Sequence, residues 1–144
     1  MLSPIQLRQH VFTAIDIETI ENADSPTEES YAIDLKFGAP EKREDLWHGK
    51  LEVSFSPETG NKARYRGRVA VQGTFAVHPD FDKTKEEALV KFNSGSLLLA
   101  AIREMVLILT SRSAKGPMEL PTFNPNLFVQ QTVAPQDQKP ASQN

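Results

Sequence analysis

The 144-residue chain contains no cysteine, only one tryptophan and two tyrosines, and its charges nearly cancel, leaving a net charge of -3. Without cysteine it can form neither a disulfide nor a thiolate metal site, and this fits a reducing compartment. The small negative charge gives no general attraction to nucleic acid. A chain of this length is expected to form one domain with a core large enough to need no covalent staples.

The sequence also lacks the motifs of common enzyme chemistry. No glycine-rich phosphate loop follows a predicted strand, and no nucleophile elbow is present. His10, His48 and His78 lie in different segments without ligand spacing, so no metal site is predicted. Asp80 and Asp82 are better explained by a turn before a helix than by an acid–base pair. We therefore expect a protein that is not an enzyme and uses no cofactor.

No targeting or membrane segment is predicted. The first ten residues contain no apolar signal core. The most apolar run, residues 97–109, is interrupted by Arg103 and Glu104 and is too short to span a bilayer. We expect a cytoplasmic protein without stable membrane insertion.

Alternating apolar and polar residues predict four strands, after a loose lead-in over residues 1–10. The strands are expected over residues 11–20, 31–37, 46–56 and 63–78. Because each strand has one apolar face, together they predict an antiparallel sheet that is covered on one side. In the first strand, the residues predicted to face the core are Val11, Thr13, Ile15 and Ile17.

Three arginines, Arg64, Arg66 and Arg68, are predicted to project from the outer face of the fourth strand. They could form an anion or nucleic-acid stripe. They could instead lie on a solvated face, paired across strands with residues such as Glu52. The net negative charge of the chain favours the second interpretation.

The pattern changes to helical spacing after the fourth strand. A short helix is predicted over residues 85–92, with a break at Asn93-Ser94-Gly95, followed by a long helix over 96–112 and a last one over 125–132. The tail, residues 133–144, is rich in Pro, Gln, Ser and Ala and is expected to be disordered. The predicted class is α+β, a four-stranded antiparallel sheet with one long and two short helices on one face.

The long predicted helix is apolar around most of its circumference. Its polar residues form a narrow stripe of Ser96, Arg103 and Thr110, with Glu104 and Ser111 beside it. A helix of this kind must be buried on more than one side, so we expect one side on the sheet. The other side would pack on another chain or bind an apolar partner, and a second copy of this chain is the simplest explanation. The residues predicted at that oligomer interface are Leu97, Leu98, Ile102, Met105 and Leu109.

The segment after this helix has two open interpretations. Phe123, Leu127 and Phe128 either cover the core or line an exposed apolar groove, which would be a binding site.

The stretch from residue 94 to 128 resembles the SecB family of export chaperones. It carries, in the family's order, Leu98-Leu99-Ala100-Ala101-Ile102-Arg103-Glu104, Thr110-Ser111-Arg112, Gly116-Pro117, Leu120-Pro121-Thr122-Phe123-Asn124 and Leu127-Phe128. Upstream, Val71-Gln72-Gly73-Thr74-Phe75 resembles the end of the family's fourth strand. The resemblance covers roughly residues 8–131.

The resemblance implies a homotetramer, built as a dimer of dimers, that holds unfolded or nascent polypeptides in long apolar grooves without nucleotide. The implied groove residues are Leu120, Phe123, Leu127 and Phe128. The apolar side of the long helix that does not pack on the sheet would then be an oligomer interface.

The chain departs from the family where the translocation motor SecA would dock. An outward Leu-x-Glu is replaced by Arg66 and Arg68, although Asp16 matches an acidic position of the first strand, and the tail lacks the zinc-binding motif. Asp16, Arg66 and Arg68 together mark a candidate partner-docking face. We predict an ATP-independent holdase, with a dedicated client such as an antitoxin. The alternatives are an export chaperone that delivers preproteins to SecA and a small-ligand-binding α+β module.

Overall fold

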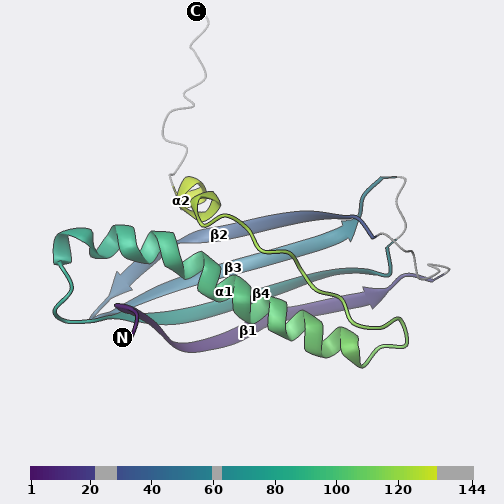
Figure 1. The fold of residues 1–144 in the computed structure, drawn as a ribbon, viewed down its shortest axis with the longest axis horizontal. Coiled ribbons are helices and arrows are strands. Elements are labelled where there is room, and N and C mark those ends of the chain that lie inside the picture. Colours follow the sequence, from purple (N-terminus) through teal and green to yellow (C-terminus); the bar gives the residue numbers. More distant parts are fainter. Residues whose placement is uncertain (22–28, 60–62, 133–144) are drawn as a thin grey trace, which may run out of the picture.

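The computed structural model describes residues 1–21, 29–59 and 63–132, so the predicted tail lies outside the described residues. The chain forms an antiparallel sheet in the order β1-β4-β3-β2, and α1 crosses one face of it diagonally while α2 lies over β2 (Figure 1). This confirms the predicted α+β class and its four-stranded sheet. The elements are β1 (Ile5–Thr19), β2 (Tyr31–Arg43), β3 (Leu46–Pro57), β4 (Tyr65–Val77), the 3-10 turn η1 (Lys83–Lys85), α1 (Glu86–Ser111) and α2 (Asn126–Thr132).

The core lies between α1 and the sheet face that it covers. Side chains at every fourth position of α1, including Val90, Leu98, Ile102 and Val106, are fully buried. The strands contribute alternate residues, as expected for a half-buried sheet. The largest of these in β3 and β4 are Trp47, Leu51, Phe55, Tyr65 and Phe75. Each such aliphatic or aromatic side chain contributes about 1.5–3 kcal/mol on burial.

β1 is longer than predicted, because it begins at Ile5. The loose lead-in expected over residues 1–10 was therefore wrong from residue 5 onward. Ile5 pairs with Val77 and Leu7 pairs with Phe75, and both β1 residues contact the core. The polar sequence Arg8-Gln9-His10 hid this part of the strand.

The predicted core face of β1 was also partly wrong. The pairing of β1 with β4 shifts register between Leu7 and Gln9 and again between Phe12 and Ala14. Each irregularity changes which residues face the core, since strand side chains alternate with a period of two. As a result Val11 and Ile15 are 49% and 46% exposed, whereas Phe12 packs against the core.

α1 is one continuous helix, so the break predicted at Asn93-Ser94-Gly95 was wrong. Asn93 stays inside the helix by donating its side-chain amide to the Leu89 carbonyl at 2.8 Å. Gly95 is buried, and a Cβ added there would lie 2.3 Å from the ring of Phe128. The glycine thus allows α2 to approach α1 rather than ending the helix.

Continuity makes the helix longer than the apolar run suggested. By length and composition alone, Lys83–Ser111 is long and apolar enough to cross a membrane, so the argument from a short run does not hold for the whole helix. The same helix packs one face on the sheet, and core helices also satisfy this criterion.

Candidate functional site

A groove of about 490 Å³ lies between β2 and the extended chain that follows α1. Tyr31 and Ile33 of β2 line one side, and residues 117–121 line the other. Arg64 and Arg103 also line it. The walls thus combine apolar side chains with a few charged ones, as in many ligand-binding grooves.

The polar stripe predicted on the long helix holds one wall of this groove in place. Thr110 is fully buried, and its hydroxyl donates to the Val106 carbonyl at 2.7 Å and accepts from the Met118 N–H at 2.9 Å. Arg103 Nε donates to the Leu120 carbonyl at 2.7 Å. Arg103 and Thr110 of the stripe therefore fix the main chain of the extended segment, a role that the sequence pattern did not reveal.

Replacing Thr110 by valine should destabilise the protein by about 1–3 kcal/mol, because the buried Met118 N–H would lose its acceptor. Thr110→Ser keeps the hydroxyl and loses only a methyl group, so it should cost less, about 1 kcal/mol. Urea unfolding of both variants measures the difference. A loss in Thr110→Val no larger than that in Thr110→Ser would contradict the role of the hydroxyl.

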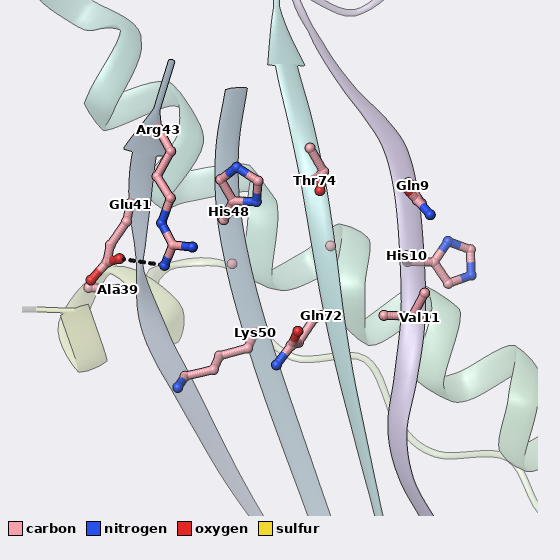
Figure 2. Close-up of a pocket in the computed structure, with 12 residues that line it drawn as sticks. Gln9, His10, Val11, Ala39, Glu41, Arg43, His48, Lys50, Gln72 and Thr74 are labelled. Atoms are coloured by element: carbon pink, nitrogen blue, oxygen red, sulfur yellow. Dashed lines mark hydrogen bonds and ion pairs between the residues drawn. The ribbon is translucent and has the colours of Figure 1, made fainter. Parts of the chain in front are cut away.

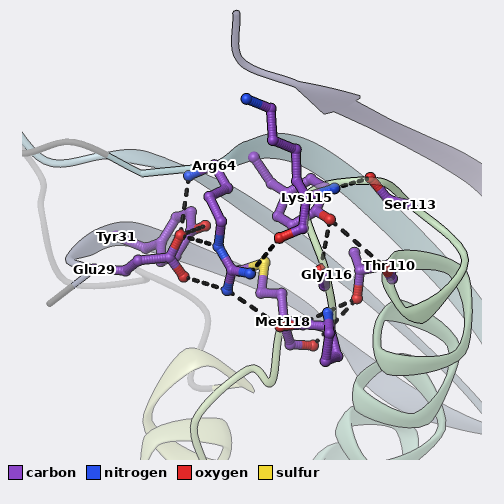
Figure 3. Close-up of polar contacts among 10 residues, drawn as sticks. Glu29, Tyr31, Arg64, Thr110, Ser113, Lys115, Gly116 and Met118 are labelled. Carbon is purple, nitrogen blue, oxygen red and sulfur yellow. Dashed lines mark hydrogen bonds and ion pairs between the residues drawn. The ribbon is translucent and has the colours of Figure 1, made fainter. Parts of the chain in front are cut away.

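Arg64 lines the groove at the point where Glu29 and Pro117 both contact its guanidinium. Figure 3 shows the polar contacts of Arg64. Its guanidinium forms a two-point ion pair with Glu29, with Nη2 2.8 Å from Oε2, and its Nη1 donates to the Lys115 carbonyl at 2.6 Å. Nη2 also donates to the Pro117 carbonyl at 3.1 Å. The prediction that Arg64 projects outward was wrong, because it precedes β4 and strand alternation does not reach it.

The ion pair between Arg64 and Glu29 shifts the pKa values of both residues, and the pKa of Tyr31 beside them is shifted as well. Hydrogen bonding from Arg64 holds the pKa of Glu29 below its ordinary value, and hydrogen bonding to Glu29 raises the pKa of Arg64. Burial, followed by the adjacent Glu29 charge, raises the pKa of Tyr31 to about 12. The Tyr31 hydroxyl therefore stays neutral at physiological pH, and this part of the groove carries a compensated pair of charges.

Two of the predicted groove residues belong to the core of this chain. Leu120 and Phe128 are fully buried. Leu120 still borders the groove described above, whereas the assignment of Phe128 to an exposed groove was wrong. The Phe128 ring packs edge-on against Phe37 at 5.3 Å between centroids. Phe123 and Leu127 are partly buried at the margin of the core, and their role in binding stays a prediction.

The predicted oligomer interface also divides in two. Leu98 and Ile102 are fully buried against this chain's own sheet and cannot lie at an interface. Leu97 and Met105 are half-buried, while Leu109 is 38% exposed. The outer face of α1 also exposes Phe92 and Ile108, at 43% and 47%, which the sequence pattern did not single out.

The candidate docking face formed by Asp16, Arg66 and Arg68 is exposed on the sheet. Asp16 pairs in register with Arg68, and Glu18 pairs with Arg66. Arg68 Nη1 also lies 2.9 Å from a Glu52 carboxylate oxygen. The arginines are thus matched by acids on neighbouring strands, which supports the solvated, paired face over an anion stripe.

A second hollow, of about 500 Å³, lies on the sheet at the opposite end from this docking face (Figure 2). Its lining is polar and includes His10, His48, Lys50 and Thr74. The described residues contain no group of three or more His, Cys, Asp or Glu side chains that could hold a metal ion.

No protein-family model matches this chain, and no curated protein matches it. Among solved structures it is similar to the SecB-like chaperone of Mycobacterium tuberculosis in complex with a ChAD peptide from the HigA1 antitoxin. That match has a TM-score of 0.55 and 19% sequence identity, and covers 83% of this chain and 91% of the other. A protein of unknown function from Streptococcus agalactiae matches with a TM-score of 0.45 and 11% identity, over 81% and 96% of the two chains. The chain therefore has the SecB-like fold that its sequence predicted.

Proposed function

We propose that this protein is a SecB-like chaperone that binds polypeptide segments in extended, non-native form, without nucleotide. The observation that carries the proposal is the groove between β2 and the chain after α1. Its walls offer apolar contacts from Tyr31, Ile33 and Pro121, and two of its charged residues, Arg64 and Glu29, neutralise each other. Such a groove suits the apolar segments that an unfolded chain exposes.

A dedicated client, such as an antitoxin, is the form of this function that we favour. The similar chaperone of Mycobacterium tuberculosis binds a peptide from an antitoxin. The alternative, delivery of preproteins to SecA, would use the face around Asp16, Arg66 and Arg68. The charges there are balanced across neighbouring strands, which favours the dedicated role. We place the activity in the cytoplasm.

We also propose that the protein works as a homo-oligomer, with four copies in the favoured assembly. The outer face of α1 exposes Phe92, Ile108 and Leu109, and β1 is an edge strand of the sheet with Val11 and Ile15 exposed. Burying these side chains against a second copy removes apolar surface from water. Native mass spectrometry measures the number of copies, and a monomer would contradict this part of the proposal.

The purified protein should suppress the thermal aggregation of citrate synthase when present at one oligomer per client. Ile33→Thr should weaken that protection about tenfold, because Ile33 lines the groove and the change removes roughly 1–2 kcal/mol of apolar contact with the client. Phe123→Ala changes the partly buried residue that the sequence predicted for client binding, and should weaken protection to a similar extent. Light scattering during heating follows the aggregation, and circular dichroism checks that each variant is folded.

Thr122→Ala is the matched control, since Thr122 is exposed beside Phe123. It should protect the client as well as the unchanged protein does. The proposal fails if the unchanged protein does not suppress aggregation. If Ile33→Thr protects fully while the unchanged protein is active, the groove is not the binding site.

A further inference from the structure

The side chain of Gln131 in α2 is hydrogen-bonded to the free edge of the sheet. Its Oε1 accepts from the Phe37 N–H at 3.0 Å, and its Nε2 donates to the Leu35 carbonyl at 2.9 Å. In the part of the chain that the structure describes, β2 is the last strand of the sheet, and its other edge pairs with β3. The Gln131 amide thus donates one hydrogen bond to β2 and accepts one from it, as the main chain of an added strand would do at this position.

The remainder of this edge differs from one end of β2 to the other. Beyond Phe37 the pairing with β3 shifts register between Gly38 and Glu41, a stretch that contains Pro40, which has no N–H to offer. A bulge and a proline both discourage pairing with another strand. In the opposite direction, Tyr31 and Ile33 lie at the groove. One end of the edge thus disfavours pairing with another strand, and the other end borders the candidate site.

Alternate residues of a strand direct their main-chain groups to the same edge. The Leu35 carbonyl and the Phe37 N–H point toward Gln131. The main-chain groups of Tyr31 and Ile33 therefore point toward the same edge, beside the groove. An extended polypeptide that pairs with Tyr31 and Ile33 would meet the amide of Gln131 at its next pairing position.

We infer that Gln131 is an internal competitor for the client, because its amide occupies a strand-pairing position of β2 that an extended polypeptide takes when it displaces it. The inference rests on the proposed function and identifies what limits binding at that site. A carboxamide has the same donor and acceptor as a peptide group, so the two exchange without leaving a buried polar group unpaired. The occupant is a polypeptide main chain in extended form.

α2 is built so that this contact can be released. It spans seven residues, and the buried ring of Phe128 anchors it against Gly95 and Phe37. Gln131 lies in the next turn toward the end of the helix and is itself exposed. Its side chain can therefore leave the edge while Phe128 stays in the core.

The test compares Gln131→Ala with Gln130→Ala, its exposed neighbour on α2, in the full-length protein. In the free protein, hydrogen exchange should speed up at the Phe37 amide in Gln131→Ala only. The binding probe is a fluorescein-labelled 12-residue peptide of alternating apolar and polar residues, with a copy that is N-methylated at alternate amides. The unmodified peptide should bind Gln131→Ala about tenfold more tightly than it binds the unchanged protein, and should restore protection at Phe37. The methylated copy should lose this gain.

The possible results separate the two ideas. If hydrogen exchange at the Phe37 amide does not change in Gln131→Ala, Gln131 does not protect the edge of β2 and the inference is overturned. If exchange changes but both proteins bind the peptide equally, or the methylated copy binds as well, competition for the edge is overturned while the proposed function stands. If neither protein binds any peptide, the proposed function falls and competition falls with it.

Discussion

Replacing Gly95 by alanine should destabilise the protein by about 2–3 kcal/mol, although alanine ordinarily stabilises a helix interior by about 1 kcal/mol relative to glycine. The added Cβ would lie 2.3 Å from the Phe128 ring, which is fully buried between α1 and β2. The ring cannot move aside without leaving the core, so α2 must shift with it. Urea unfolding at neutral pH measures the loss, and a stabilised variant would show that α2 does not dock on Gly95.

Phe128→Ala alone should cost about 3–5 kcal/mol, since it empties a buried aromatic site beside Phe37. The double variant with Gly95→Ala should be much less unstable than the sum of the two losses. Once the ring is gone, the methyl group at residue 95 has room and regains its helix preference. Additive losses would mean that the two residues do not share one contact.

Ser94→Ala provides the control for this pair. Ser94 is fully buried one residue from Gly95, and among the residues that the structure describes its hydroxyl finds no hydrogen-bond partner. Removing an unpaired buried hydroxyl should leave stability unchanged or raise it by about 1 kcal/mol. A loss from this variant as large as that from Gly95→Ala would mean that the helix tolerates no change there, so the steric argument would fail.

The sequence was sufficient for the class and the sheet because those depend on short-range alternation. β2 and β3 follow a period of two closely enough to be assigned as strands. β1 did not, because its two register shifts depend on how it pairs with β4, which no local pattern encodes. Gly95 was misread for a related reason. Glycine can end a helix or admit a neighbouring ring, and only the tertiary position of Phe128 distinguishes these roles.

Little of the candidate site could be predicted from the sequence. Of the predicted groove residues, Leu120 lines the groove between β2 and the chain after α1, while Phe128 points into the core. An apolar side chain in an irregular segment has no periodicity that separates buried from exposed positions. The groove is shaped by hydrogen bonds between side chains and main-chain groups. Arg64 donates to the Lys115 carbonyl, and Thr110 accepts from the Met118 N–H. Neither composition nor residue spacing predicts contacts of this kind.

Replacing Arg64 by methionine should cost about 2–4 kcal/mol at pH 7. The change leaves the partly buried Glu29 carboxylate without its cation and removes the donors to the Lys115 and Pro117 carbonyls. Arg64→Lys keeps the charge but cannot form the two-point ion pair while also reaching both carbonyls, so it should recover only part of the loss. Equal stability of the lysine variant and the unchanged protein would mean that charge alone is sufficient.

The same pair predicts how stability depends on pH. The pKa of Glu29 is lower in the folded protein than its ordinary value of 4.5, chiefly through the hydrogen bonds from Arg64. Its contribution is therefore fully present above pH 4.5 and is lost as the pH falls below that value and Glu29 becomes protonated. In Arg64→Met the folded-state pKa should rise toward or above 4.5, so this part of the acid destabilisation should vanish. Urea unfolding at pH 7 and pH 3.5 gives the difference for each protein. A variant that loses as much stability between the two pH values as the unchanged protein would show that Glu29 owes its low pKa to something other than Arg64.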